Sequence, residues 1–229
     1  GLHVSAVQKD PKTYEHIEPK LVGNQRNIVV SDQSGKSNII SRLKTIGIEV
    51  DNEDPKIKKI LNEVKDREFI GYSYDGADAS FELLARRIIG EIPTYLTISE
   101  YDVSVKKNNK GKIISIAKAH ILVDGNEVVC EGEGNGPVNA LDNAIRKNVD
   151  KVGKYSKYLK DLKLVDYKVR ILNTGTEAIT RVSIESTDSK GKNWFTIGVS
   201  TNIIEASFKA LIDSLDYKLF KEQAPASKL

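Results

Sequence analysis

The chain of 229 residues is 39% hydrophobic and 29% charged, so it can bury a core, and global disorder is excluded. Its net charge is only +3, with Lys and Arg scattered among Asp and Glu, which excludes the basic stripe of a nucleic-acid-binding protein. A lone cysteine excludes an internal disulfide, and neither an apolar run of ~20 residues nor a signal-peptide pattern occurs. We therefore expect a cytoplasmic chain without a membrane partner.

Residues 1–92 are predicted to be mainly helical and to fall into two parts, at about 1–50 and 51–92. Polar capping residues and terminating glycines predict three helices, which run from about residue 37 to Gly47, from Pro55 to about Phe69 and from Asp78 to Gly90. Apolar residues recur in them at helical spacing. This part has little apolar material for a large core of its own, so we expect it to pack against something absent from this chain.

Residues 93–219 are predicted to form a strand-strand-strand-helix unit twice, over 93–152 and 162–219. The predicted strands are 95–105, 112–123 and 128–132, then 165–172, 178–186 and 194–199, and a helix follows each set. Antiparallel sheets with helices on one face define an α+β fold with pseudo-two-fold symmetry. Residues 220–229 are expected to be a frayed tail.

The two units are copies of each other at a fixed offset of 66 residues. The strongest matches are Tyr101 with Tyr167, Gly125 with Gly191, Gly132 with Gly198, Ala140 with Ala206, and Ala144 with Ala210. A register that holds without a gap over ~50 residues indicates an internal duplication. The seam between two such units is a common place for a small ligand, which favours a ligand-sensing module over a self-contained enzyme.

The side chains alone do not assemble a complete active site. The segment Gly132–Pro137 has neither the spacing of a dinucleotide-binding loop nor a following Lys-Ser/Thr pair, so a tight strand-to-helix turn is favoured. His3, His16 and His120 have no partners at metal-ligand spacing. Cys130 is expected to pack as a small hydrophobe.

Several segments resemble one enzyme family. Gly1-Leu2-His3-Val4-Ser5-Ala6-Val7 resembles the segment that follows the catalytic barrel in the isopropylmalate and homocitrate synthase family. Segments similar to the citramalate synthase branch of that family lie at 76–84, 134–142, 166–171, 185–186 and 202–207. The resemblance therefore runs from residue 1 to about residue 219. It implies that residues 1–92 are two linker subdomains and that residues 93–219 are the regulatory domain.

The resemblance implies an acyltransferase that joins the methyl carbon of acetyl-CoA to a keto acid, which is pyruvate in the citramalate branch, on the route to isoleucine. The barrel and its divalent metal would precede Gly1, and the absence of Met from the chain agrees with a missing upstream portion. This part is then expected to need no cofactor and to be inactive alone. A linker His and Tyr of the family reach into the barrel of the partner subunit; His3 matches that His, and Tyr14 matches the Tyr.

The resemblance also implies a homodimer that binds a branched-chain amino acid as feedback inhibitor where the units meet. By position, the effector site comprises Asn135, Val138, Leu164, Tyr167, Ile171 and Ala178. Ordinary core packing is the alternative role for the apolar members. Isoleucine is the expected effector if the product is citramalate. Two alternatives stay open: the C-terminal part of an isopropylmalate synthase, in leucine biosynthesis, and a stand-alone branched-chain amino-acid sensor.

Overall fold

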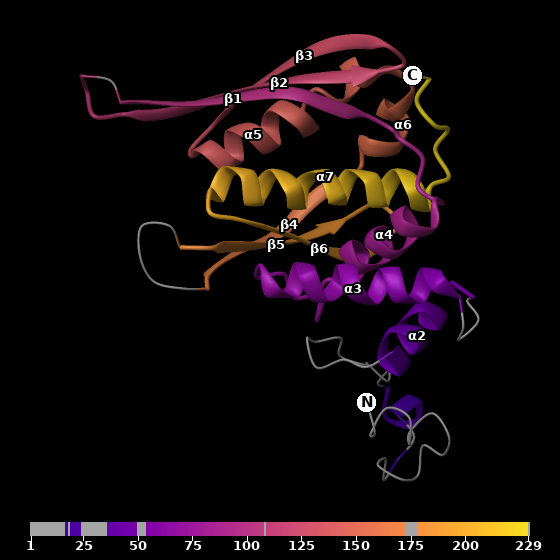
Figure 1. The fold of residues 1–229 in the computed structure, drawn as a ribbon. Helices are drawn as coiled ribbons and strands as arrows, with labels where there is room; N and C mark the ends of the chain where they lie inside the picture. Colours follow the sequence, from indigo (N-terminus) through magenta and orange to yellow (C-terminus); the bar gives the residue numbers. More distant parts are fainter. Residues whose placement is uncertain are drawn as a thin grey trace.

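The computed structural model describes residues 17, 19–23, 36–49, 54–107, 109–172 and 178–228. Two three-stranded antiparallel sheets lie on either side of a layer that contains two helices, and the N-terminal helices stack below the second sheet (Figure 1). The predicted α+β class is confirmed.

The linker begins with the 3-10 helix η2 (Pro19–Val22) and continues with α2 (Lys36–Thr45), α3 (Pro55–Phe69) and α4 (Asp78–Ile89). The start of α3 follows its capping signal, because the Asp54 side chain accepts a hydrogen bond from the Lys56 N–H at 2.8 Å. The end of α4 follows from Gly90, whose φ of +80° lies in the left-handed region.

The linker helices share a core of their own. Its fully buried side chains include Ile39 and Leu43 of α2, Ile57 of α3 and Phe81 of α4. Ile197 of the second sheet also joins this cluster. The expectation that this part has little core of its own is therefore wrong: three short amphipathic faces meet in one cluster and anchor it to the regulatory units.

The first sheet contains β1 (Thr97–Lys107), β2 (Ile113–Val123) and β3 (Asn126–Gly134) in the order β1-β2-β3. The second contains β4 (Lys163–Ile171), β5 (Thr180–Thr187) and β6 (Asn193–Ser200) in the order β4-β5-β6.

The duplication extends to an irregularity of the backbone. The β1–β2 register shifts between Ile98 and Glu100, and the β4–β5 register shifts between Leu164 and Asp166, at equivalent positions of the two copies. A bulge of this kind bends its strand and increases the local twist, so both sheets curve at the same place.

Each sheet carries one helix on its inner face, α5 (Pro137–Arg146) on the first and α7 (Ile203–Lys221) on the second. Between the units run η3 (Val149–Tyr155) and α6 (Ser156–Leu159). Helix α7 also faces the first sheet, because Phe208 and Leu215 belong to the core beneath that sheet, whereas Ala206 and Ala210 pack on the second.

The repeated glycines and alanines have a single structural cause. A Cβ atom on Gly132 would lie 2.2 Å from the backbone nitrogen of Ala144, and one on Gly198 would lie 2.0 Å from the backbone oxygen of Ala206. Each helix therefore lies directly on the strand before it, at a distance that only glycine permits. The duplicated pattern of the sequence marks this close packing.

The C-terminal residues differ from the expectation of a frayed tail. Helix α7 continues to Lys221, and the residues after it return to the first unit. The Ser227 N–H donates to the Thr94 carbonyl at 2.8 Å, and the Tyr155 hydroxyl donates to the Pro225 carbonyl at 2.9 Å. These two hydrogen bonds join residues 70 or more positions apart, which local sequence pattern cannot reveal.

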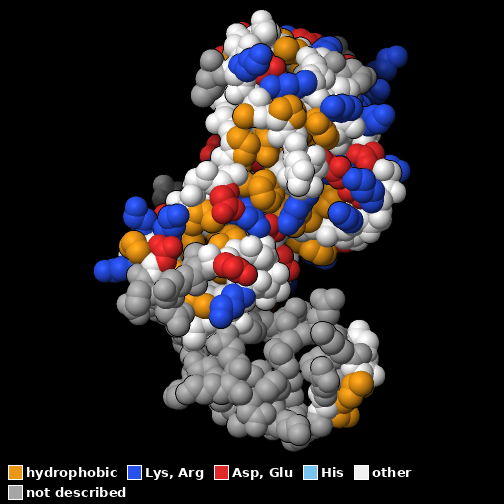
Figure 2. All heavy atoms as spheres, turned by 90° about the vertical axis from the view of Figure 1, so that its right-hand side faces the viewer, with side chains coloured by type: hydrophobic (Ala, Val, Ile, Leu, Met, Phe, Trp, Pro, Cys, Tyr) orange, Lys and Arg blue, Asp and Glu red, His pale blue; other side chains and the backbone are white. Residues whose placement is uncertain are grey.

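Figure 2 shows the face on the right of Figure 1, where Lys and Arg side chains are interspersed with Asp and Glu and apolar side chains lie between them. This agrees with the mixed charge pattern of the sequence.

Candidate regulatory site and its junction with the linker

The equivalent tyrosines of the two units both reach the first turns of α7. The Tyr101 hydroxyl of β1 donates to Glu205 at 3.1 Å, and its ring stacks on Phe208 with centroids 4.5 Å apart. The Tyr167 hydroxyl of β4 lies 2.8 Å from the Ser207 hydroxyl. Burial raises the pKa of both phenols, so both remain neutral hydrogen-bonding groups near pH 7. One end of α7 is thus held by side chains from both sheets.

The structure brings together two of the six predicted effector residues. Leu164 and Tyr167 pack on one cluster with Val182 and Ile184 of β5 and Leu211 of α7. A cavity of about 10 Å³ adjoins Leu164, and the other five predicted residues do not line it. Such a volume holds about one water molecule, so it is too small for an amino acid.

The other four predicted residues lie at the ends of elements. Ile171 ends β4 and is 71% exposed, and Ala178 lies partly buried shortly before β5. Asn135 is exposed in the turn before α5, where its N–H donates to the Asn139 side chain at 3.3 Å, and Val138 lies partly buried in the first turn.

The predicted catalytic residues His3 and Tyr14 lie outside the described residues. Their role stays a prediction.

The starts of the two equivalent helices differ in how their N–H groups are satisfied. At α7 the Asn202 side chain accepts from Ile204 at 2.8 Å and from Glu205 at 3.4 Å. At α5 the N-cap is Gly136, which has no side chain to cap the helix, and Pro137 follows it. The first turn of α5 therefore offers N–H groups that no cap side chain occupies, in a position that favours negative charge.

The other end of α7 is joined to linker helix α4 by charged groups. Arg87 donates to Asp213 and to Asp216, both at 2.7 Å. Ser80 donates to Asp213 at 2.8 Å and accepts from the N–H of Ile197 at 3.0 Å, so it links α4 to both α7 and the edge of β6.

The carboxyl group of Asp216 has an unusual acidity. Its burial, against the attraction of Arg87, raises the pKa of Asp216 to about 6. The Asp216 carboxyl group therefore loses its proton, and gains its negative charge, as the pH rises through about 6.

Glu82 forms a second connection between α4 and α7. This buried carboxylate accepts from Arg86 at 2.8 Å, from Lys221 at 2.7 Å and from the Tyr217 hydroxyl at 3.2 Å. Burial first, and then the Glu82 charge, raise the pKa of Tyr217, so the hydroxyl stays a donor. Sequence reasoning missed this junction, because no spacing rule pairs residues 80–91 with residues 213–221.

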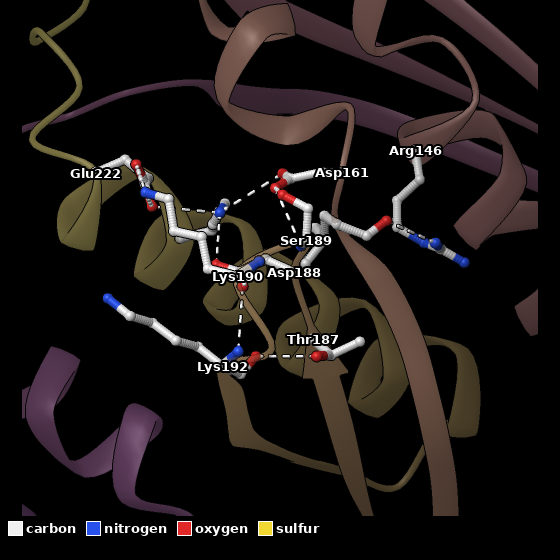
Figure 3. Close-up of polar contacts among 10 residues, drawn as sticks. Arg146, Asp161, Thr187, Asp188, Ser189, Lys190, Lys192 and Glu222 are labelled. Carbon is white, nitrogen blue, oxygen red and sulfur yellow. Dashed lines mark hydrogen bonds and ion pairs between the residues drawn. The ribbon is translucent and has the colours of Figure 1, made fainter.

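A buried ammonium group lies near the end of α7. Lys218 is 3% exposed in its side chain and contacts Asp188 at 2.7 Å, Glu222 at 3.4 Å and Asp161 at 3.5 Å. Figure 3 shows the three labelled carboxylates around this one nitrogen. Burial opposes ionisation of Asp188, but hydrogen bonds from Lys218 and from the N–H groups of the turn outweigh it and hold its pKa below the usual range.

The part of the chain that the structure describes contains neither a grouped metal site nor a membrane-spanning helix. No three His, Cys, Asp or Glu side chains there are grouped to hold a metal ion. No helix in those same ranges is both long and apolar enough to cross a bilayer.

This duplicated βββα architecture defines the class of protein. The family described as the LeuA allosteric (dimerisation) domain matches residues 75–219, and the homocitrate synthase post-HMGL domain-like family matches residues 1–69. The first match covers more than half of the chain, so the chain belongs to the LeuA allosteric domain family. That match includes α4 as well as the two units.

The curated relatives agree with the predicted branch. An (R)-citramalate synthase of Aquifex aeolicus is 47% identical over 226 residues, which cover 97% of this chain and 42% of the relative. The (R)-citramalate synthase of Geobacter sulfurreducens is 45% identical over the same shares, and that of Sulfolobus acidocaldarius is 42% identical over all of this chain and 42% of its own length. The resemblance is confirmed, and the chain spans about two fifths of the length of these relatives.

Proposed function

We propose that this chain is the regulatory part of an (R)-citramalate synthase, which pairs with a second copy, binds a branched-chain amino acid and passes the binding signal to the linker. The observation that carries this proposal is the position of α7. Tyr101 and Tyr167 hold one end of this helix, and Arg87 and Glu82 of the linker hold the other. The names of the relatives support the assignment of the enzyme.

The reaction belongs to the whole enzyme. Acetyl-CoA and pyruvate are its proposed substrates, and a divalent metal held in the catalytic barrel of the whole enzyme would polarise the keto group. His3 and Tyr14 assist in the barrel of the partner subunit, His3 as a proton carrier and Tyr14 as a donor to a developing oxyanion. The fragment without the barrel is inactive. The pathway is isoleucine biosynthesis, in the cytoplasm.

The effector site suits an amino acid with a branched aliphatic side chain. Val138, Leu164, Ile171 and Ala178 supply apolar surface, and Tyr167 supplies a hydroxyl. The uncapped first turn of α5, next to Asn135, suits the carboxylate of the ligand. The capped start of α7 does not, because Asn202 already occupies its N–H groups.

A second copy of the chain completes this site. Val105 and Ile171 occupy equivalent positions of the two units and are 57% and 71% exposed. Exposed apolar side chains at matched strand ends are typical of a surface that pairs with another protein. The expected assembly is a homodimer, which light scattering after size-exclusion chromatography checks directly.

Helix α7 is the proposed route of the signal. A ligand that bears on Tyr167 shifts the start of α7, and the ion pairs of Arg87 transfer that shift to α4. Couplings of this kind amount to about 1–3 kcal/mol.

The test is calorimetric titration of the purified chain with isoleucine, then with leucine, valine and lysine. Saturable binding of isoleucine in preference to the others is the expected result. A preference for leucine would instead identify an isopropylmalate synthase. A folded dimer that binds none of these amino acids contradicts the effector role.

An exposed apolar residue of the linker supplies the control. Ile171→Ala should weaken isoleucine binding about tenfold, whereas Leu21→Ala, on the exposed 3-10 helix η2, should change it less than about twofold. Equal effects of the two substitutions would place the site elsewhere. In the full-length enzyme, Ile171→Ala should raise the isoleucine concentration needed for inhibition without lowering the uninhibited rate.

A further inference from the structure

A cavity of about 340 Å³ lies beside the β5–β6 turn and the last turns of α7. We call it the aromatic–lysine pocket; its main lining residues are Asp188, Lys192, Trp194, Tyr217, Lys218 and Lys221. None of the six proposed effector residues lines it. Tyr217 follows Ser207, the partner of Tyr167, by ten residues on α7, which corresponds to about 15 Å along a helix. The aromatic–lysine pocket is therefore separate from the proposed effector site, although both lie along α7.

Two aromatic rings form the apolar part of this pocket. Trp194 and Tyr217 have ring centroids 6.0 Å apart, tilted by 38°. The Trp194 N–H donates to Ser214 at 3.1 Å, and the Tyr217 hydroxyl donates to Glu82 at 3.2 Å. Because the polar end of each ring is already bonded to the protein, the part of each ring that lines the cavity is apolar, although Trp194 as a whole is only 6% exposed.

The cations of the pocket differ in whether they are neutralised. Lys218 is paired with three carboxylates, and Lys221 is paired with Glu82. Lys192 has no ion-pair partner among the described residues, and in Figure 3 its ammonium lies away from the carboxylates.

The backbone of Lys192 is nevertheless held in place. Its N–H donates to Asp188 at 3.2 Å, and its carbonyl accepts from Thr187 at 3.0 Å. A fixed backbone thus carries an unneutralised cation at the edge of an aromatic-lined cavity.

We propose that the aromatic–lysine pocket binds a small organic monocarboxylate with a flat apolar body, whose carboxylate pairs with Lys192 and whose body lies on Trp194 and Tyr217. A single negative charge is favoured because Asp188 and Glu222 also line the cavity and would repel a polyanion. The volume lies at the lower end of the range for small-molecule sites, which suits a ligand of this class.

Such a ligand would also bear on the linker. Lys221 and Tyr217 are the residues by which the end of α7 holds Glu82 of α4. A ligand body that lies on Tyr217 contacts one of the two residues that hold Glu82. The pocket therefore acts on the same helix junction as the proposed effector, from the opposite end of α7.

The chain contains one tryptophan, so its fluorescence reports on this pocket alone. We would titrate the whole chain with sodium phenylacetate and follow Trp194 emission together with heat release, using acetate and the uncharged analogue 2-phenylethanol as comparisons. The expected result is a saturable response to phenylacetate that exceeds both comparisons. Lys192→Gln should weaken phenylacetate binding about tenfold, and Lys107→Gln, on an exposed strand end of the first unit, should leave it unchanged.

Three outcomes would overturn this proposal: no saturable response by either readout, equal responses to phenylacetate and 2-phenylethanol, or unchanged binding by Lys192→Gln. Far-UV circular dichroism checks that both variants are folded. Isoleucine binding should be the same in Lys192→Gln as in the unmodified chain. The proposal is thus separable from the proposed effector site: either site can fail without the other.

Discussion

The two units of this protein have the same strand order, the same bulge and the same glycine-to-helix contact, yet their helices differ. Helix α5 has 10 residues and packs on its own sheet, whereas α7 has 19 residues and contacts both sheets and linker helix α4. The duplication produced two units with the same sheet architecture, and the longer helix of the second unit, α7, connects both units to the linker. Function is therefore expected to concentrate on α7.

The largest expected effect comes from a feature that the first unit lacks. Asp188 and Lys218 form a buried ion pair, and the position equivalent to Asp188 in the strand pairing of the first unit is Val123. Lys218→Ala should lower the free energy of unfolding by about 3–5 kcal/mol, because it leaves a buried carboxylate without its partner. Urea denaturation followed by circular dichroism measures this loss.

The double variant Asp188→Leu/Lys218→Met is the control for that prediction. It removes both charges together and should recover most of the lost stability. If the double variant is as unstable as Lys218→Ala, the loss reflects packing rather than the unpaired charge.

The next effect tests whether the two copies are equivalent. Gly132→Ala and Gly198→Ala should each cost about 3 kcal/mol, because the new methyl group meets helix backbone in both units. Gly136→Ala is the matched control, since no atom lies within 4 Å of its Cβ position and the stability should change little. A loss in only one of the two variants would show that one helix can move away from its sheet.

A smaller effect should appear as pH dependence at the α4–α7 junction. The pKa of Asp216 is about 6 in the folded chain and near 3.8 in the unfolded chain, so the folded state binds a proton more readily between these values. The contribution of Asp216 to the free energy of unfolding is therefore present at low pH and is lost as the pH rises through 6. Lowering the pH from 7 to 5 should raise the free energy of unfolding by about 1 kcal/mol.

The sign of the pH dependence distinguishes Asp216 from Asp188. Asp188 has a lowered pKa, so its contribution is present above its unfolded pKa and is lost only as the pH falls through its still lower folded pKa. Asp216→Asn should flatten the stability profile between pH 5 and 7. An unchanged profile in that variant would assign the titration to a different group.

The smallest effect compares the equivalent tyrosines. Tyr101→Phe loses the bond to Glu205 but keeps the stack on Phe208, and Tyr167→Phe loses the contact with Ser207. Each should cost about 1 kcal/mol or less of stability. Only Tyr167→Phe is expected to weaken isoleucine binding, and a similar loss in Tyr101→Phe would indicate one site in each unit.

Local signals predicted most of the fold because they act over a few residues. Asp54 and Pro55 fixed the start of α3, and the left-handed turn at Asp124 and Gly125 joins β2 to β3 as expected. The duplicated glycines and alanines indicated the paired units before any packing was known.

The junctions between units were not predictable in the same way. The Arg87 contacts with Asp213 and Asp216 join residues more than 120 positions apart, and the sequence around them reads as ordinary exposed helix. The six proposed effector residues came from resemblance, and the structure joins Leu164 and Tyr167. The others lie at element ends, where a position in sequence does not determine a position in space.

The return of the C-terminal segment to the first unit bears on how the chain folds. Ser227 accepts from the N–H of Asp124 at 2.8 Å, and Ala224 is buried in the core that includes the first sheet. The residues after α7 thus bind the first unit, so neither unit can unfold completely while these contacts remain. Duplicated units often melt in separate steps, but these two should unfold in one cooperative transition. Removing residues 222–229 should split that transition into two.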